Sequence, residues 1–425
     1  MIATFSPAAL RGFAQAPASK SEAHRRMICA GLSREPVTLT GFMDSADMAA
    51  TGRCLKALGA APRLDLAAGT LDIQGFAERP ALLPVFDCGE SGSTLRFFVP
   101  IALALTHGGT FRMHGRLGQR PMDVYRDLFV PRGVMWHMGE GADNTAELTV
   151  TGSLVPGGYT LPGDVSSQFV SGLLFALPLL QGESTLTVLP PVESAGYIRM
   201  TLQAIRDAGI TVEEVSPFSW RVPGFQSYHA RSGALHGDWS QATVLLCADA
   251  LGAEISVSGL NPDSVQGDRA ILTHLQSFGA EVSLNDGLYT VQTQPLHGTV
   301  LDLHDCPDIA PMLALVAQLA EGESRLSGCG RLRLKECDRL AATIAMLNAL
   351  GGCAREEGDD MVIRGVPSLK GNVELNSCND HRMVMLASIA ALRADGPVTV
   401  TDVQALNKSW PGYPELYRSL GGQMV

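Results

Sequence analysis

The sequence predicts an α/β protein built from six copies of one module, and two features of the chain indicate this fold class. Small-residue stops that end helical segments recur along all 425 residues, at Gly59, Gly133, Gly209, Gly279, Gly351 and Gly421. Subtracting neighbours gives intervals of 74, 76, 70, 72 and 70 residues. Strand-like stretches keep the same interval. Two landmarks with one period indicate a repeated supersecondary unit.

Each predicted module joins apolar helices to strands of alternating polarity. Glycine adopts the left-handed conformation that closes a helix more readily than any other residue. Strand patterns lie at 37–40, 110–113, 184–188, 254–258, 324–327 and 398–401. Apolar helices are predicted at 97–106, 169–180, 242–251, 310–319 and 383–392, and their composition is typical of helices buried on most sides.

The repeats divide into two halves. The chain contains 45 glycines, so the glycine series alone could arise by chance, but the strand series shares its interval. Between the third and fourth copies, residues 217–235 are rich in Ser, Pro, Gly and Arg and lack periodicity. We therefore expect the chain to cross between two three-copy halves near the end of this segment.

The composition indicates a globular protein and disfavours several partners. Apolar residues make up 46% and charged residues 18%, and 425 residues exceed one ordinary core. A net charge of -11 disfavours nucleic acid and anionic membranes. Nine cysteines without a Cys-x-x-Cys pair predict neither a metal site nor a disulfide framework. Without a signal peptide or a membrane-length apolar stretch, we expect a cytoplasmic protein.

Polar clusters in the first half of the chain stand at predicted helix starts. Lys20, Ser21 and Arg25 suit an anion there, although an ordinary capped helix entry has the same appearance. Gly92 would let a ligand approach the backbone closely. The other members are Arg120 before Pro121, the set Ser166-Ser167-Gln168 and, more weakly, Ser194 and Tyr197.

Clusters in the second half contain the groups that could transfer protons. They are Asp308, the alternating cations and carboxylates at 334–339, the segment 379–382 and the segment 407–411. Each cluster alone fits a solvated, salt-bridged surface. Because nearly every cluster precedes a helix at a recurrent place in the repeat, we expect helix dipoles and cations to act together on anions in one cleft.

Together these motifs resemble those of the 5-enolpyruvylshikimate-3-phosphate synthase family over essentially the full length. They are Lys20-Ser21 with Arg25, Ser91-Gly92-Ser93 with Arg96, Arg120-Pro121, Ser166-Ser167-Gln168, Lys335-Glu336 with Asp338-Arg339, Asp380-His381-Arg382 and Lys408-Ser409. The resemblance implies the two-domain enolpyruvyl transferase fold, an inside-out α/β barrel of six βαβαββ repeats, three per domain. It assigns residues 1–18 and 236–425 to domain I and 19–235 to domain II, with the active site in the cleft between them.

The resemblance also implies which residues bind two substrates. Shikimate-3-phosphate is expected at Lys20, Ser21, Arg25, Ser166, Ser167, Gln168, Ser194, Asp308 and Lys335. Phosphoenolpyruvate is expected at Lys20, Gly92, Arg120, Gln168, Arg339, Arg382 and Lys408. Two bound anions repel each other and lose hydration, so several cations are required. No metal or other cofactor is expected, and the chain is expected to act as a monomer, without nucleic-acid or membrane partners.

The implied reaction is the addition–elimination that transfers enolpyruvyl to the 5-hydroxyl of shikimate-3-phosphate and releases phosphate, within the shikimate pathway to chorismate and aromatic amino acids. Its catalytic residues would be Lys20, Asp308 and Glu336, and Glu336 would need partial burial to hold a transferable proton. Glu90 and Phe97 stand near Gly92, where many members carry Asn and Pro. We still expect Gly92 to admit the inhibitor glyphosate.

Two alternatives accompany this interpretation. The sister enzyme that uses UDP-N-acetylglucosamine has the same plan, but its loop cysteine would fall at Gly115, and this chain has no cysteine between Cys88 and Cys247. A non-catalytic homologue of the fold should have lost ionisable positions. Lys20 and Glu336 are both present, as are the other predicted proton-transfer groups.

Overall fold

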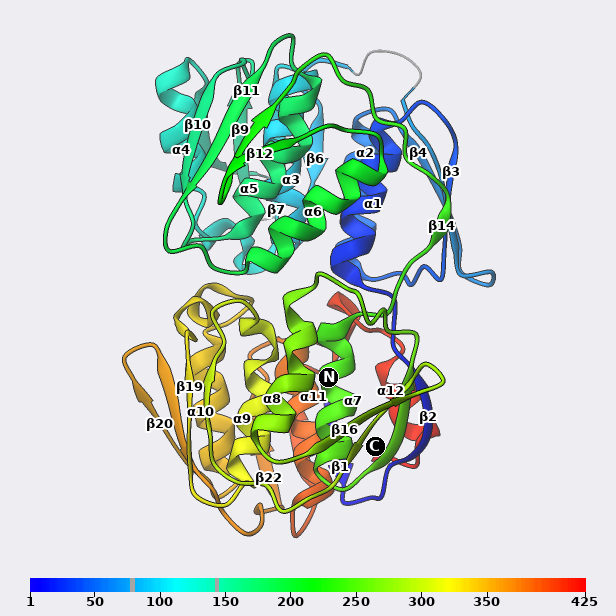
Figure 1. Ribbon diagram of the computed structural model, residues 1–425, viewed down its shortest axis with the longest axis vertical. Coiled ribbons are helices and arrows are strands. Elements are labelled where there is room, and N and C mark those ends of the chain that lie inside the picture. Colours follow the sequence, from blue (N-terminus) through cyan, green and yellow to red (C-terminus); the bar gives the residue numbers. More distant parts are fainter. Residues whose placement is uncertain (77–80, 142–144) are drawn as a thin grey trace. The chain divides into compact units, whose positions relative to one another are not determined.

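The computed structural model describes residues 1–76, 81–141 and 145–425, which form two compact units. Unit 1 comprises Met1–Ser19 and His236–Val425, and unit 2 comprises Lys20–Leu235. The described residues form six four-stranded sheets, three in each unit (Figure 1). In every sheet one edge strand pairs in parallel with its neighbour, and the other two strand pairs are antiparallel. This repetition confirms the predicted sixfold α/β fold.

The sheets of unit 2 are completed within its own residues. Their strand orders are β14 (Gly233–Ala234), β3 (Val37–Thr40), β5 (Thr70–Gln74), β4 (Ala61–Asp65); β6 (Val85–Asp87), β7 (Gly108–Met113), β9 (Ala146–Thr151), β8 (Met135–Glu140); and β10 (Gly158–Pro162), β11 (Ser184–Leu189), β13 (Ser219–Val222), β12 (Glu213–Ser216). Its described helices are α1 (Lys20–Leu32), α2 (Ala46–Ala57), α3 (Gly92–Leu105), α4 (Asp123–Phe129), α5 (Ser167–Ala176) and α6 (Ala195–Asp207). Because β14 lies parallel to β3, the last residues of unit 2 complete its first sheet.

Unit 1 takes strands from the start of the chain. Its sheet orders are β2 (Arg11–Gln15), β15 (Glu254–Ser258), β17 (Leu288–Gln292), β16 (Glu281–Asn285); β18 (Val300–Asp302), β19 (Glu323–Ser327), β21 (Asp360–Arg364), β20 (Cys353–Glu357); and β22 (Val373–Leu375), β23 (Val398–Thr401), β1 (Ile2–Ser6), β24 (Gln423–Met424). Its described helices are α7 (Trp239–Ala250), α8 (Ile271–Ser277), α9 (Ala310–Gln318), α10 (Arg339–Ala349), α11 (His381–Ala390) and α12 (Tyr413–Ser419). The first fifteen residues therefore supply β1 and β2 to two different sheets.

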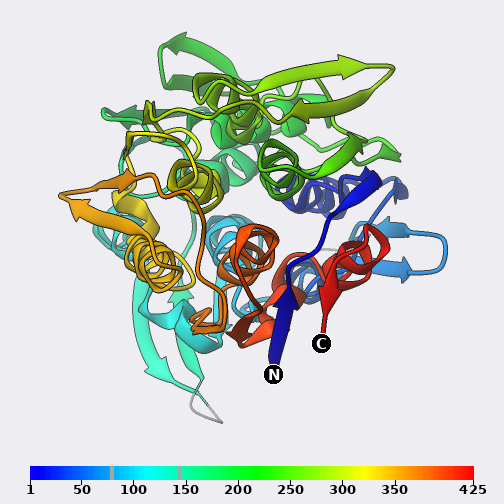
Figure 2. The same ribbon diagram turned by 90° about the horizontal axis from the view of Figure 1, so that it is seen from below.

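Buried helices form the core of each unit. In unit 1 every residue of α7, α9 and α11 is buried, and the three helices contact one another. Figure 2 shows them end-on, in green, olive and orange, with strands around them. In unit 2, α3 packs against α5, and α5 packs against α6. Helices that are apolar on all sides can be buried only if strands cover them, which is the arrangement observed.

The predicted helix stops are confirmed by backbone geometry. All six glycines have positive φ angles between 81° and 98°. Each follows a helical segment, where a residue with a Cβ would be strained.

Four of the five apolar helices begin earlier than their patterns predicted, among them α5 at Ser167 rather than residue 169 and α7 at Trp239 rather than residue 242. Helix α3 begins at Gly92 rather than at residue 97, and α11 begins at His381 rather than at residue 383. The Ser91 hydroxyl accepts a hydrogen bond from the Thr94 amide, and the Asp380 carboxylate accepts one from the Arg382 amide. These first turns are polar because side-chain caps hold them, and apolar periodicity therefore does not mark them.

Asp249 links α7 to two strands and gives unit 1 a pH-dependent stability. Its carboxylate accepts hydrogen bonds from the amides of Ile255 (3.0 Å) and Val291 (2.6 Å). Burial raises the pKa of Asp249 to about 6. Because the unfolded chain releases this proton at a lower pH, the contribution is complete below about pH 4 and is lost as the pH rises through 6.

We expect Asp249→Asn to remove this dependence. The unfolding free energy of the parent chain, measured by urea denaturation, should fall between pH 4 and pH 7. That of the variant should fall less over the same range. Glu281→Gln, at an exposed carboxylate of β16 in the same sheet, is the control and should keep the parental difference. An unchanged pH profile in Asp249→Asn would contradict the prediction.

Candidate active site

Arg339 is the centre of a buried ion cluster in unit 1. Its side chain is only 2% exposed and lies at the start of α10, after the Asp338 N-cap. The guanidinium donates to Asp380 at 2.7 Å, to Asp308 at 2.8 Å and to Glu336 at 2.5 Å. Although burial opposes charge, these three carboxylates hold the pKa of Arg339 well above its usual range. The segment 334–339 is therefore not the solvated surface that its charge pattern also allowed.

Asp308 shares two cations in the same cluster. It lies in the short helix η6 (Pro307–Ile309), and its Oδ1 atom is 2.9 Å from Lys335 Nζ and 2.8 Å from Arg339 Nη1. Burial alone would raise its pKa, but Lys335, Arg382 and Arg339 together hold the pKa of Asp308 far below the usual carboxyl range. Burial lowers the pKa of Lys335, and Asp308 opposes that effect. Asp308 is therefore an ionised, weakly basic carboxylate in this cluster.

Asp380 connects this cluster to α11. It is fully buried, caps the helix through the Arg382 amide at 2.9 Å and accepts from Arg339. The Arg382 guanidinium donates to the Ser240 hydroxyl at 2.6 Å, which fixes it against the first turn of α7. The predicted residues Asp308, Lys335, Glu336, Arg339 and Arg382 are thus brought together by one network.

Lys408 lies at the edge of the same region. It ends the short helix η9 (Val403–Lys408) and donates from Nζ to the Asn379 carbonyl at 2.9 Å, one residue before Asp380. The predicted segments 379–382 and 407–411 therefore meet in unit 1.

Helix α1 presents three of the predicted residues in unit 2. Lys20 is its first residue and pairs with Asp47 of α2 at 2.8 Å. Arg25, one turn further, donates to the Ser21 carbonyl and to the Thr201 hydroxyl, both at 2.8 Å, and lies over the Phe97 ring. Burial lowers the pKa of Arg25 to about 10, so it remains a cation near neutral pH.

Phe97 is the departure from the family pattern that now has a structural explanation. It is fully buried, and its ring supports the Arg25 guanidinium at 5.4 Å from the ring centre. A cation held over an aromatic face gains electrostatic stabilisation that proline at this position could not provide.

The start of α5 places an amide beside a second arginine. Ser166 is the N-cap, and Ser167 and Gln168 begin the helix. Gln168 accepts from Arg96 at 2.7 Å and donates to the Ser93 hydroxyl at 2.8 Å. The two motifs that contain Gly92 and Gln168 are therefore joined directly through the starts of α3 and α5.

The Arg120 guanidinium limits the space around Gly92. A Cβ built at Gly92 would lie 2.7 Å from Arg120 Nη1, so any larger residue would displace this guanidinium. Gly115, where the sister enzyme would carry its cysteine, has a φ of +55°, and a Cβ there would lie 2.9 Å from Glu90 Cδ. The Glu90 side chain therefore fills the space that a side chain at position 115 would need. Ser194 has a positive φ of 55° as the N-cap residue of α6.

The predicted residues fall into two groups, one in each unit. The structure brings Asp308, Lys335, Glu336, Arg339, Arg382 and Lys408 to one region of unit 1. The members in unit 2 are Lys20, Ser21, Arg25, Gly92, Arg120, Ser166, Ser167, Gln168 and Ser194. Most of them stand at the starts of α1, α3, α5 and α6; Arg25 lies one turn into α1, and Arg120 follows the short helix η1 (Gly115–Gln119), three residues before α4.

Sequence reasoning missed three partners that hold predicted cations, and one of them is Thr201 of α6, which accepts from Arg25. Asp47 binds Lys20 across 27 residues, and Ser240 binds Arg382 across 142 residues. Both lie in first helical turns, next to the N-caps Ser45 and Asp238, so a search for polar first-turn residues would have marked them. Their pairing is long-range, and no local pattern encodes it.

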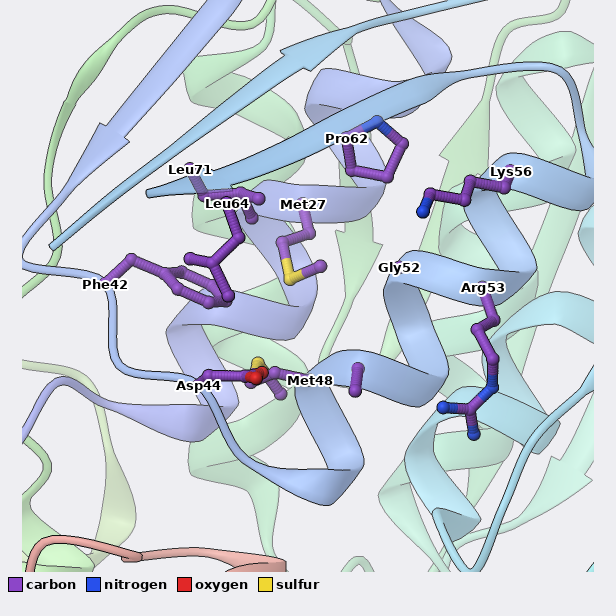
Figure 3. Close-up of a pocket in the computed structure, with 11 residues that line it drawn as sticks. Met27, Phe42, Asp44, Met48, Gly52, Arg53, Lys56, Pro62, Leu64 and Leu71 are labelled. Carbon is purple, nitrogen blue, oxygen red and sulfur yellow. The ribbon is translucent and has the colours of Figure 1, made fainter. Parts of the chain in front are cut away.

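One cavity in unit 2 lies apart from these groups. It has a volume of about 250 Å³ between α1, α2, β4 and β5, and Figure 3 shows Met27, Met48 and Leu71 around it, with Lys56 turned toward it. Gly52 of α2 borders the cavity, and a Cβ built there would meet nothing within 4 Å. The cavity contains none of the predicted site residues.

Gly52→Ala should therefore stabilise the protein. Alanine is about 0.5–1 kcal/mol more favourable than glycine inside a helix, and here it meets no atom. Gly172→Ala in α5 is the matched control with the opposite sign, because its Cβ would lie 2.3 Å from the Arg96 carbonyl oxygen. Thermal unfolding of both variants tests this prediction, and a lower Tm for Gly52→Ala would contradict it.

Within residues 1–76, 81–141 and 145–425, no group of three or more His, Cys, Asp or Glu side chains is placed to hold a metal ion. None of the helices in these ranges is long and apolar enough to cross a bilayer.

The fold is that of the enolpyruvyl transferases. EPSP synthase from Acinetobacter baumannii superimposes with a TM-score of 0.80 at 23% identity, covering 100% of this chain and 99% of that one. The enolpyruvyl transferase NikO from Streptomyces tendae gives 0.79 at 19% identity, covering 100% and 98%. At these identities the likeness establishes the fold alone.

Sequence comparison then identifies the family. The family model described as EPSP synthase (3-phosphoshikimate 1-carboxyvinyltransferase) matches residues 6–416, and the chain belongs to this family. The 3-phosphoshikimate 1-carboxyvinyltransferase of Clostridioides difficile is 37% identical over 98% of this chain and 97% of its own length. That of Clostridium beijerinckii is 38% identical over 98% and 96%.

Proposed function

We propose that this chain is a 3-phosphoshikimate 1-carboxyvinyltransferase that transfers the enolpyruvyl group of phosphoenolpyruvate to the 5-hydroxyl of shikimate-3-phosphate. The observation that carries the proposal is the family match through residues 6–416, which includes every predicted site residue. The clustered cations of each unit support it, because two phosphate-bearing substrates need several positive charges to offset repulsion and desolvation.

The proposed sites follow the two groups of residues. Shikimate-3-phosphate would bind Arg25 and the α5 start from unit 2 and Asp308 and Lys335 from unit 1. Phosphoenolpyruvate would bind Gly92, Arg120 and Gln168 and, from unit 1, Arg339, Arg382 and Lys408. Lys20 would contact both. This assignment requires residues 1–18 and 236–425 to close against 19–235 around the substrates, as the domains of the family are expected to do.

The reaction proceeds in two balanced steps. First, the 5-hydroxyl oxygen bonds to the central enol carbon while the methylene carbon takes a proton and the hydroxyl loses one. Then the bond from that carbon to the phosphate oxygen breaks, the methyl group loses a proton, and inorganic phosphate leaves. Asp308 would accept the hydroxyl proton, and Lys20 and Glu336 would exchange protons with the methylene carbon.

Substrate binding would prepare Asp308 for this task. Without substrate, Lys335, Arg382 and Arg339 hold its pKa far below the usual range, where a carboxylate is a poor base. Bound phosphate and carboxylate groups would share these cations and bring negative charge nearby, and both effects raise the pKa of Asp308. The ion pair with Arg339 at 2.5 Å favours the ionised form of Glu336, so this pair would have to weaken for Glu336 to carry a proton.

As part of the same proposal, the family resemblance implies a monomer in the cytoplasm, and the nine free cysteines fit a reducing compartment. Competition by glyphosate at Gly92 also stays a prediction. An inhibition assay against phosphoenolpyruvate addresses it.

Phosphate release is the decisive assay. The purified chain, mixed with phosphoenolpyruvate and shikimate-3-phosphate, should release inorganic phosphate and form the enolpyruvyl ether. With UDP-N-acetylglucosamine in place of shikimate-3-phosphate it should release none. Release only with the nucleotide sugar would reassign the chain to the sister activity, and release with neither substrate would favour a non-catalytic homologue.

A further inference from the structure

A continuous chain of buried hydrogen bonds connects three helices of unit 2. His24 Nδ1 is 2.7 Å from the Thr51 hydroxyl, and Thr51 is 2.8 Å from the Thr94 hydroxyl. The Thr94 hydroxyl donates to Ser91 Oγ at 2.8 Å. All four side chains are at most 1% exposed. The chain therefore runs from α1 through α2 to the cap of α3 without contact with solvent.

The direction of the protons along this chain is determined by its last bond. A hydroxyl has one proton, and Thr94 gives its own to Ser91, so Thr51 must donate to Thr94. Thr51 then accepts from His24, which places the imidazole proton on Nδ1. Burial, followed by Lys20 and Arg25, lowers the pKa of His24, so the ring is neutral, as this order requires.

The hydrogen-bonded side chains lie next to residues that the proposed function uses at both ends of the series. Lys20 and His24 are one turn apart on α1, and their partners Asp47 and Thr51 are one turn apart on α2. The two helices are thus joined twice on one face, once by the part-buried ion pair and once by the fully buried hydrogen bond. At its other end, Ser91 caps α3 immediately before Gly92. A buried polar group is costly unless it is hydrogen-bonded. The four linked side chains therefore fix the distance between the first turns of these helices.

Resting on the proposed function, we propose that His24, Thr51, Thr94 and Ser91 are positioning residues that set the place of Gly92 and its neighbouring amides relative to Lys20, and thereby the affinity for phosphoenolpyruvate. The free amides of a helix start bind an anion only if they are aimed at it. The Ser91 cap aims the start of α3, and the hydrogen bonds through Thr94 and Thr51 link this cap to His24 of α1. Cooperative polarisation along the aligned hydroxyls strengthens this support.

Thr51→Val tests the inference because it removes both bonds at the middle of the chain with little change of shape. We expect the KM for phosphoenolpyruvate to rise about tenfold, as the loss of a buried hydrogen bond typically produces, with kcat and the KM for shikimate-3-phosphate nearly unchanged. Thr51→Ser keeps the hydroxyl and should restore the parental KM. Thr94→Val breaks the same chain at α3 and takes the place of Thr51→Val if that variant does not fold.

Thr106→Val is the matched control. Thr106 is also fully buried, and its single hydroxyl proton is shared between the Ala102 and Gly108 carbonyls at the far end of α3. It should lower Tm comparably without moving the KM. An equal KM shift in Thr106→Val, an unmoved KM in both Thr51→Val and Thr94→Val, or a failed rescue by serine would overturn the inference alone. A parent chain inactive with shikimate-3-phosphate would overturn the proposed function and this inference together.

Discussion

Arg339→Ala is expected to lower the free energy of unfolding by about 3–5 kcal/mol, the usual cost of removing one partner from a buried ion pair. The substitution would leave Asp380 fully buried and Asp308 and Glu336 without their shared guanidinium. Urea denaturation of the full chain measures this loss. We also expect phosphate release to fall below detection, because the proposed phosphoenolpyruvate site loses a cation.

Two further variants separate burial from charge. Arg325→Ala removes an arginine that also pairs with two carboxylates, Glu357 and Asp360, but its side chain is 39% exposed. Surface pairs contribute about 0–1 kcal/mol, so this loss should be small. Arg339→Lys keeps the charge yet cannot reach three carboxylates with one ammonium. Its stability should therefore lie between that of the parent chain and that of Arg339→Ala. Equal losses in Arg325→Ala and Arg339→Ala would reject the buried-hub explanation.

Glu336→Gln is expected to reduce kcat by about 10²–10⁴-fold, the range for loss of a proton-transfer group, while substrate binding is retained. Glutamine has nearly the same shape and can still accept from Arg339, so the effect reports the missing proton chemistry rather than a lost contact. Steady-state phosphate release gives kcat, and equilibrium binding of shikimate-3-phosphate checks that the site persists.

The control for Glu336→Gln is Glu356→Gln. Glu356 also accepts from an arginine, Arg333, at 2.8 Å, but on the surface. Its kcat should equal that of the parent chain. Full turnover in Glu336→Gln would remove Glu336 from the proposed mechanism and leave proton transfer to Lys20 and Asp308.

The polar helix starts show which parts of a helix a short sequence pattern can predict. The apolar helices and the glycine stops could be predicted because their signals lie within a few residues of each other. Apolar periodicity did not predict the first turns of α3, α5, α7 and α11, because side-chain caps hold them; the caps are Ser91, Ser166, Asp238 and Asp380. Patterns of this kind locate a site at helix starts without saying which side chains meet there.

By itself, the sequence determined the α/β class, the sixfold repeat and the residue types needed to bind two anions, because repeats and motifs are properties of short segments. Only the tertiary structure decided that Arg339 is buried among three carboxylates and that Lys20 pairs with Asp47. It also decided that four hydroxyl and imidazole groups from three helices form one chain. These contacts join residues far apart along the chain, and their strength depends on burial, which is a property of the packed helices and not of any single segment.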